Sequence, residues 1–262
     1  MSDSNLSKKP LTISVVGKGG SGKTAITTLL AKSISKNYDF KILLIDADPT
    51  HPHLSQMVKL VPEKSLEKLR VNVIDQILTN AKDFEKAAED IDMEVYNAIM
   101  ENKDFSLFSI GQPEEPGCFC PSNTLLRKVI KSISKDFDII LIDCEAGLEQ
   151  INRMVIETVD ILLIVADISL RSVETAATIS KSADKFTRYK QLGVILNKVR
   201  GDIEFLLKKL DDLNLPLMAE IPEDENIVQF DSKGKPLIDL PEKSPSLLSV
   251  HKLVKQILDG TE

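Results

Sequence analysis

The sequence predicts an α/β fold in which a mostly parallel sheet is covered by helices on both faces. Short apolar runs recur along the chain, and they are continuous rather than alternating. Continuous runs indicate strands that are buried on both faces. Segments with helical periodicity separate these runs, as expected when crossover helices join parallel strands. The 262 residues are enough for one domain of this kind with a large core.

The predicted strands follow one another along the chain. They span residues 11–16, 41–45, 105–110, 139–142, 161–166, 192–196 and 217–221. The segment after Lys23 has apolar residues at helical spacing, and so does the segment 246–258. We expect the second of these helices to dock on the sheet. A membrane-surface helix would need a polar face rich in Lys and Arg, and only Lys252 and Lys255 are available here.

Two regions differ from this strand and helix pattern. Residues 1–10 are polar and without an apolar core, so we expect a flexible N-terminal segment rather than a signal peptide. Residues 62–104 are acidic and weakly periodic, and we expect a helical insertion there, with a helix over 83–102. This insertion precedes a loop with a Cys-x-Cys motif at residues 118–120. Residues 11–262 as a whole are predicted to form a single domain.

Composition excludes several classes of protein. The net charge of −7 disfavours binding to the nucleic-acid backbone, which requires Lys and Arg. No apolar stretch approaches the roughly 18 residues of a membrane-spanning helix. Three cysteines are too few for a disulfide framework, so we expect a reducing, cytoplasmic location. From the net charge and the apolar stretches we expect no nucleic-acid partner and no membrane partner.

Residues 17–24 read Gly-Lys-Gly-Gly-Ser-Gly-Lys-Thr and form a P-loop motif between the first strand and a helix. Glycines allow backbone N–H groups to surround phosphate oxygens at the positive end of the following helix. In this pattern Lys23 reaches the β- and γ-phosphates, and the Thr24 hydroxyl holds Mg²⁺. The alternative is a chance glycine-rich turn, which the flanking strand and helix disfavour. The motif predicts a single P-loop NTPase domain that binds ATP and ADP with Mg²⁺.

Carboxylates follow two of the predicted strands. Asp46 and Asp48 end the second strand, and Asp143 ends the apolar run 139–142 in the manner of a Walker B motif, which holds Mg²⁺ through water. A single Asp at a strand end is often a helix cap or a turn residue. Several acids at the carboxyl edge of a parallel sheet, next to a P-loop, indicate a ligand site instead.

Lys18, a second lysine inside the loop, gives the motif a close resemblance to the deviant Walker A of the family that includes MinD, ParA and the nitrogenase iron protein. The resemblance implies an ATPase whose homodimer closes on ATP, with Lys18 reaching the partner's nucleotide. It makes Asp48 the residue that orients the attacking water, and it places Asp46 near the Mg²⁺ shell. The implied catalytic residues are Lys18, Lys23 and Asp48, and the implied Mg²⁺ site is Thr24, Asp46 and Asp143.

The same resemblance implies which residues bind the nucleotide. Asn197 follows the strand 192–196 and matches an Asn that recognises the adenine edge in relatives. Residues 221–224 resemble the segment that packs on the other side of the base. Turn chemistry explains either feature equally well. The predicted nucleotide-binding residues are Thr12, Gly19, Gly20, Ser21, Gly22, Lys23, Thr24, Asn197, Pro222 and Glu223.

Cys118 and Cys120 flank Phe119 in a segment that leads into a helical pattern near Ser122. The N-terminus of a helix favours thiolates. With one residue between them, the two cysteines cannot easily form a disulfide with each other. Two thiolates make half of a soft tetrahedral site, and a symmetric dimer would supply the other half. The alternative is two incidental cysteines, and spacing alone does not decide between these interpretations.

The run from Gly117 to Arg127 resembles the cysteine region of the CooC-type ATPases, which are maturation factors of carbon monoxide dehydrogenase. The segments 143–149, 169–176 and 234–237 resemble other stretches of that family, so the likeness extends from about Thr12 to Leu240. It implies a metallochaperone that binds Ni²⁺ or Zn²⁺ through Cys118 and Cys120 at a dimer interface. The implied client is a nickel enzyme, either carbon monoxide dehydrogenase or acetyl-CoA synthase.

Two other functions stay open. One is an activator or reductase like the nitrogenase iron protein, with an iron–sulfur cluster bridging the dimer, although the cysteines of that protein are well separated along the chain. The other is a positioning ATPase like MinD or ParA, which the net charge and the missing basic C-terminal helix disfavour.

Three further residues allow two interpretations each. His51 and His53, close to Asp48, are either auxiliary metal ligands or loop residues, and the pattern favours loop residues. Cys144 is expected to be a small core residue rather than a third ligand.

Overall fold

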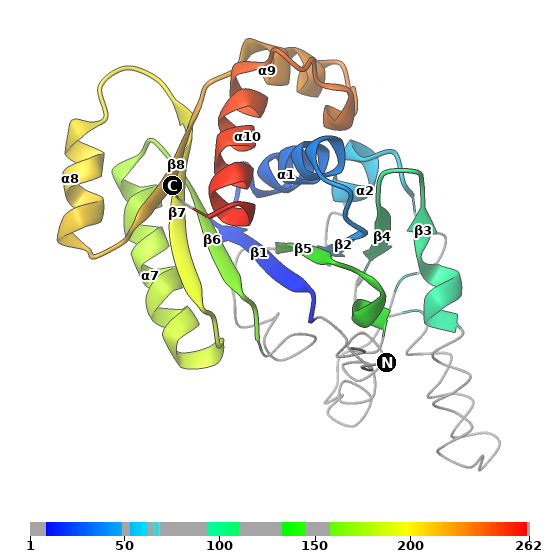
Figure 1. Cartoon of the computed structure of the whole chain (residues 1–262). Coiled ribbons are helices and arrows are strands. Elements are labelled where there is room, and N and C mark those ends of the chain that lie inside the picture. Colours follow the sequence, from blue (N-terminus) through cyan, green and yellow to red (C-terminus); the bar gives the residue numbers. More distant parts are fainter. Residues whose placement is uncertain are drawn as a thin grey trace.

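The computed structural model describes residues 9–48, 53–61, 65, 68, 94–109, 133–144 and 158–260. Within these residues the strands form one eight-stranded sheet in the order β3-β4-β2-β5-β1-β6-β7-β8 (Figure 1). The neighbouring strands are parallel except for β3 and β4. The predicted α/β fold is therefore confirmed.

Each predicted strand is present, with ends that shift by a few residues. The strands are β1 Leu11–Gly17, β2 Ile42–Ala47, β3 Met100–Glu101, β4 Ser106–Ser109, β5 Ile139–Cys144, β6 Ile161–Asp167, β7 Gln191–Val199 and β8 Leu217–Pro222. The helices are α1 Lys23–Asn37, α2 His53–Met57, α7 Leu170–Phe186, α8 Glu204–Asp212, α9 Glu225–Ser232 and α10 Pro245–Leu258, and the short 3₁₀ helices are η1 Ser134–Asp136 and η2 Leu237–Asp239.

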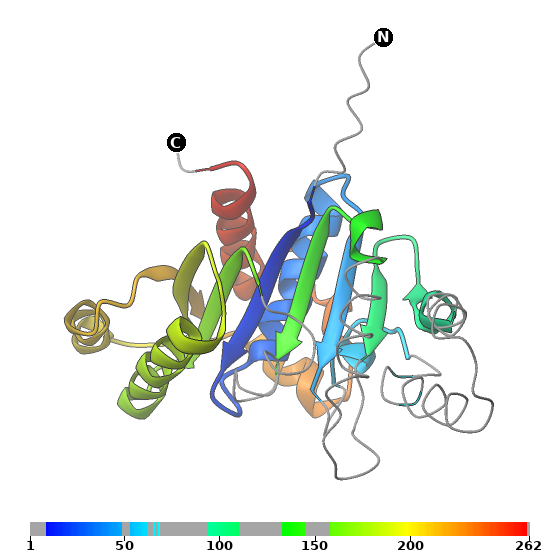
Figure 2. The ribbon, with the colours of Figure 1, turned by 90° about the horizontal axis from the view of Figure 1, so that it is seen from below.

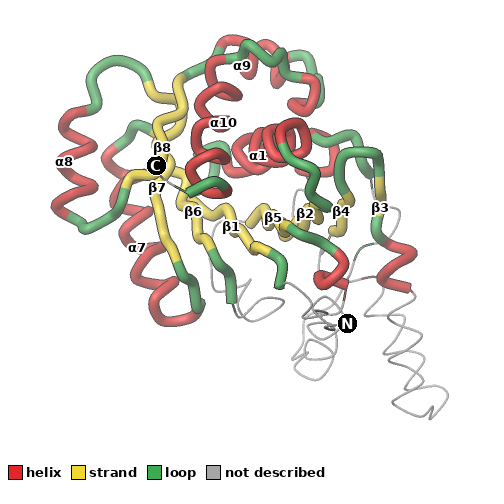
Figure 3. The backbone as a smooth tube through the Cα atoms, in the orientation of Figure 1, coloured by secondary structure: helices red, strands yellow, loops and turns green. Residues whose placement is uncertain are grey.

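Helices cover both faces of the sheet (Figures 2 and 3). Side chains of a strand alternate between faces, so each strand contributes to two separate cores. On β2, Ile42 and Leu44 join the core under α1 and α10, whereas Leu43 and Ile45 join the core under α7 and α8. Burial on both faces explains why the strand sequences are continuous apolar runs.

The helix predicted over residues 83–102 is wrong at its C-terminal end. Residues 94–98 are helical, but Met100–Glu101 form β3, which pairs antiparallel with β4. A tight turn at Asn102 joins these two strands, because its Oδ1 accepts hydrogen bonds from the N–H of Asp104 at 2.8 Å and of Phe105 at 2.9 Å. This turn reverses the chain and allows β3 to pair with β4. Most of the acidic insertion, residues 1–8 and Ile110 lie outside the described residues.

Helix α10 docks as predicted. Its apolar stripe, with Leu247, Val250, Leu253 and Val254, is buried in the core shared with α1. Among the described residues, no helix combines the length and the apolar character needed to cross a membrane.

Candidate functional site

The P-loop leaves the carboxyl end of β1 in a conformation that requires glycine. Gly17 has φ +153°, and a Cβ there would lie 2.3 Å from the carbonyl oxygen of Val165 on β6. The loop then enters α1, which begins at Lys23 without a capping side chain because Gly22 is its N-cap. The backbone N–H groups of the first turn therefore stay available for an anion.

Gly22 and Asn197 are in close contact, although they are far apart in the sequence. A Cβ on Gly22, which has φ +98°, would lie 2.3 Å from Nδ2 of Asn197. Asn197 is buried at the end of β7, and its Nδ2 donates a hydrogen bond to the carbonyl oxygen of Ser21 at 2.8 Å. The end of β7 thus holds the P-loop in place.

Two lysines also bind P-loop carbonyl groups. Lys23 Nζ donates to the carbonyl oxygen of Lys18 at 3.3 Å, and Lys198 Nζ donates to that of Gly20 at 3.2 Å. Lys198 has φ +58° and lies where the register of β7 and β8 shifts, between Asn197 and Val199. Such a bulge redirects a side chain, in this case toward the P-loop. The sequence predicted no role for Lys198, because a positive φ at a lysine has no sequence signature.

Asp46 and Asp143 are register partners on β2 and β5, and they are 0% and 2% exposed. Burial, and then the charge of Asp143, raise the pKa of Asp46 to about 7. Burial raises the pKa of Asp143 to about 6, against the opposing effect of hydrogen bonds from Thr24 and Thr27. The structure therefore brings Thr24, Asp46 and Asp143 together at the foot of the P-loop.

These residues fit a hard divalent cation. Asp46 Oδ1 accepts a hydrogen bond from the N–H of Asp48 at 3.2 Å, whereas its buried Oδ2 has no hydrogen-bond partner among the described residues. Carboxylate and hydroxyl oxygens are the ligands that Mg²⁺ prefers, and it binds through one or two carboxylates together with phosphate and water. A cation here would also relieve the repulsion between the two carboxylates.

A pocket of about 720 Å³ extends from the P-loop to α9. This volume suits a ligand of nucleotide size. Its lining includes the predicted residues Gly19, Gly20, Gly22, Lys23, Thr24, Asp48, Asn197, Pro222 and Glu223. Asp224, from the predicted segment 221–224, lines it too, and other lining residues were not predicted, among them Met57, Lys198, Ile227, Val228, Asp231 and Ser246. The α9 residues among them follow the predicted segment 221–224, but only the fold shows that this helix is a wall of the pocket.

Comparison with known proteins now identifies the family. The model of the CobQ/CobB/MinD/ParA nucleotide binding domain matches residues 13–237. The chain belongs to this family. The MinD/ParA-type protein is thus a P-loop ATPase, and its predicted ATPase activity is supported by this match and by the relatives described next.

Two curated relatives align along nearly the whole MinD/ParA-type chain. An uncharacterized ATP-binding protein of Methanocaldococcus jannaschii is 33% identical, over 94% of this chain and 98% of its own. The carbon monoxide dehydrogenase accessory protein CooC of Rhodospirillum rubrum is 30% identical, over 94% of this chain and 96% of its own.

Solved structures of MinD show the same fold. The cell division ATPase MinD of Pyrococcus furiosus superposes with a TM-score of 0.69 at 24% identity, covering 96% of this chain and 99% of its own. The septum site-determining protein MinD of Pyrococcus horikoshii, complexed with Mg-ADP, gives 0.68 at 25% identity, covering 95% and 96%.

One predicted nucleotide contact of this MinD/ParA-type ATPase must be corrected. Thr12 lies at the amino end of β1, the opposite edge of the sheet from the P-loop. Its N–H donates to Oδ2 of Asp160 at 2.9 Å, and it does not line the pocket. Thr12 therefore has a structural role and is removed from the candidate site.

Of the three cysteines in the sequence, Cys144 alone lies among the described residues. Cys118 and Cys120 lie outside the described residues, as does His51. Cys144 is buried on β5 with its Sγ 3.1 Å from Ser14 Oγ, and burial raises the pKa of its thiol to about 12. It is thus the core residue expected.

His53 starts α2, is exposed and lines the pocket. Among the described residues, no group of three or more His, Cys, Asp or Glu side chains forms a metal site.

Proposed function

We propose that the protein is an ATP-hydrolysing metallochaperone in the cytoplasm. ATP and Mg²⁺ bind the P-loop pocket and favour a homodimer. The dimer binds a divalent metal ion, Ni²⁺ or Zn²⁺, between the cysteine pairs of its two chains, and it delivers nickel to carbon monoxide dehydrogenase or acetyl-CoA synthase. The observation that carries this proposal is the Cys118-Phe119-Cys120 motif, in a chain that aligns with the accessory protein CooC over 94% of its length.

The pocket supports a division of roles at the nucleotide. The P-loop N–H groups and Lys23 bind the phosphates, and Asn197, Pro222 and Glu223, which line the same pocket, bind the base. Thr24, Asp46 and Asp143 would hold Mg²⁺, whose positive charge would offset the negative charge of the phosphates. Asp48 lines the pocket beside this group and orients the attacking water. Lys18 contacts the nucleotide of the partner subunit.

Linkage explains how ATP controls the metal. A ligand that binds one state better than another shifts the equilibrium toward that state. In this proposal ATP favours the closed dimer, and only the closed dimer brings four thiolates together. ATP therefore raises the affinity of the protein for the metal ion, and the metal ion raises the affinity for ATP by the same factor. Hydrolysis removes this preference and allows the metal to leave.

The test is a titration of the protein with Ni²⁺ and Zn²⁺, with and without ATP and Mg²⁺, while the molecular mass is followed. We expect about one ion per two chains and a dimer that depends on both ligands. A variant with Cys118→Ala and Cys120→Ala should lose this binding. Cys144→Ala is the matched control, because it removes a buried thiol and should bind metal like the unaltered protein. Unchanged nickel affinity in the double variant contradicts the proposal.

A positioning function like that of MinD is the second candidate, since the solved MinD structures share this fold over most of the chain. The packing of α10 speaks against a membrane-bound form of this function, because the apolar stripe of α10 is used inside the core. Sedimentation with liposomes or DNA in the presence of ATP distinguishes the two functions. Brown protein after anaerobic purification would instead support a bridging iron–sulfur cluster.

A further inference from the structure

Helix α9 forms one wall of the nucleotide pocket and is only partly anchored in the core, through Ile227 and Phe230. Ile227, Val228 and Asp231 of this helix line the pocket. All residues of α9 are described, and none of them is buried. Partly buried side chains alone define the packing of α9 incompletely, so its position also depends on how its two ends are fixed.

Asp224 fixes the N-terminal end of α9. Its carboxylate is 4% exposed and accepts hydrogen bonds from the N–H of Asn226 at 2.9 Å and of Ser246 at 3.1 Å. It also accepts one from the hydroxyl of Ser244. One side chain thereby caps α9 and joins it to the start of α10.

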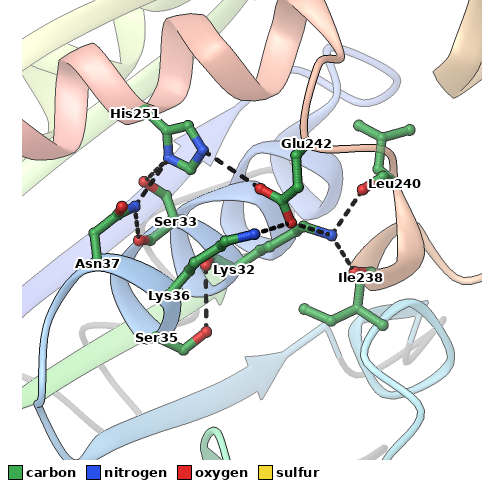
Figure 4. A network of polar contacts seen from close by, with 9 residues as sticks. All are labelled: Lys32, Ser33, Ser35, Lys36, Asn37, Ile238, Leu240, Glu242 and His251. Carbon is green, nitrogen blue, oxygen red and sulfur yellow. Dashed lines mark hydrogen bonds and ion pairs between the residues drawn. The ribbon is translucent and has the colours of Figure 1, made fainter.

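Lys32 of α1 fixes the chain that leaves the other end of α9. Its Nζ donates to the carbonyl oxygens of Ile238 and Leu240, both at 2.7 Å, and lies 3.6 Å from Oε1 of Glu242 (Figure 4). The Lys32 side chain is only 13% exposed. Buried Leu237 and Leu240 secure the same segment in the core.

The neighbours of Lys32 hold Glu242 in place. Lys36 Nζ lies 2.8 Å from Glu242 Oε1, and Nε2 of His251 on α10 lies 4.0 Å from Glu242 Oε2. His251 Nδ1 in turn lies 2.6 Å from Oγ of Ser33 on α1 (Figure 4). Side chains of α1 and α10 therefore converge on the segment that follows α9.

We propose that Lys32 is a positioning residue that sets the affinity for the nucleoside part of the nucleotide. Helix α1 begins with Lys23 and Thr24 at the phosphate end of the pocket, and Lys32 lies further along the same rigid helix. By holding residues 238–240 it fixes α9 at a defined distance from the phosphate site. This inference rests on the proposed binding of ADP or ATP in the pocket, but not on the proposed metal.

The test uses two ligands that fill different parts of the pocket. With Mg²⁺ present, Lys32→Met should weaken ADP binding about tenfold, the equivalent of one hydrogen bond to a charged group. Binding of pyrophosphate, which reaches only the P-loop, should stay unchanged. Lys36→Met is the matched control, because it removes an exposed partner of Glu242 and leaves the two carbonyl contacts intact. It should bind both ligands like the unaltered protein.

Each result has a separate meaning. Equal ADP affinity in the unaltered protein and Lys32→Met overturns the inference, and so does an equal loss for ADP and pyrophosphate, which indicates a general loss of structure. If the unaltered protein binds neither ligand, the proposed nucleotide site itself is wrong.

A measurement on the unaltered protein covers the case in which Lys32→Met does not fold. ADP, but not pyrophosphate, should slow amide hydrogen exchange at Asp239 and Leu240, whose N–H groups bond to the carbonyl oxygens of Pro236 and Leu237. Exchange there that ADP leaves unchanged also overturns the inference.

Discussion

Asp46 and Asp143 lie directly opposite each other on the neighbouring parallel strands β2 and β5, at the sheet edge that carries the P-loop. Both carboxyl groups are buried, and the charge of Lys23, which lowers the pKa of Asp143, offsets only part of the effect of burial. Two like charges so close destabilise the protein when no cation is bound. The buried pair thus lowers the stability of the metal-free protein, and it provides two carboxylates that can bind a cation.

Replacing Asp46 with Asn should therefore separate stability from activity. At alkaline pH in EDTA, Asp46→Asn should raise the unfolding free energy by at least about 1 kcal/mol, the equivalent of one pKa unit. ATPase activity with Mg²⁺ should fall at least about tenfold, because a charged ligand is lost. Urea unfolding and phosphate release measure the two effects. Asp212→Asn, at an exposed position on α8, is the control and should change neither the unfolding free energy nor the ATPase activity. A lower unfolding free energy for Asp46→Asn would contradict the prediction.

Gly22→Ala should damage the P-loop through Asn197. The new methyl group would lie 2.3 Å from Asn197 Nδ2 and displace it from the carbonyl oxygen of Ser21. We expect ADP binding to weaken at least about tenfold, since the loop loses a buried hydrogen bond and adopts a strained φ. Gly201→Ala is the control, because Gly201 also has a positive φ of +66° but open space around its Cβ position. It should lose stability without losing affinity, as followed by calorimetry.

Lys198 offers a test of backbone strain at the site. Its φ of +58° costs little for Gly and much for a β-branched residue. Lys198→Val should thus be less stable than Lys198→Gly by about 1 to 2 kcal/mol. Both variants lose the contact with the carbonyl oxygen of Gly20, so the difference between them measures the cost of the backbone conformation. Equal midpoints in urea would mean that the bulge relaxes in both.

Asp160 should control stability in acid without affecting the nucleotide. Burial by itself would raise the pKa of its carboxyl, but hydrogen bonds from Lys190 and from the N–H of Thr12 outweigh burial and lower the pKa. A lowered pKa stabilises the folded state above the pKa of the unfolded chain, near 4, and this contribution disappears as the pH falls through the folded pKa. Asp160→Asn should cost about 1 to 2 kcal/mol at neutral pH and progressively less in acid.

Urea unfolding over a pH series checks the effect of Asp160→Asn. ADP affinity is the internal control, since Asp160 does not line the pocket. A difference in stability that persists in strong acid would contradict the assigned cause.

Local patterns predicted most of the fold. The apolar runs of β5 and β6 are continuous because both faces of these strands are buried, and that property is visible in the sequence itself. Strand β3 was missed because it has two residues and exists only through its pairing with β4. The helical periodicity around it carries no information about such a pairing.

Some residues of the candidate site could likewise be predicted from local motifs, whereas others could not. The P-loop, Asp46 and Asp143 were predictable, because each belongs to a short motif next to a recognisable strand. The prediction for Thr12 failed because a strand rises about 3.3 Å per residue, which places Thr12 at the opposite edge of the sheet from the P-loop. The roles of Lys198 and of the Asp224 carboxylate became visible only in the bulge of β7 and in the hydrogen bonds of Asp224 to the start of α10.

By itself, then, the sequence of residues 17–24 determined that this protein binds phosphate, since consecutive backbone N–H groups at a helix start suffice for that. Tertiary structure alone decided which side chains complete the pocket. Asn197 touches Ser21, Asp46 faces Asp143, and Lys32 holds Ile238 and Leu240, each across a large separation in sequence. Such contacts depend on strand register and helix packing, which are properties of the whole sheet rather than of any segment.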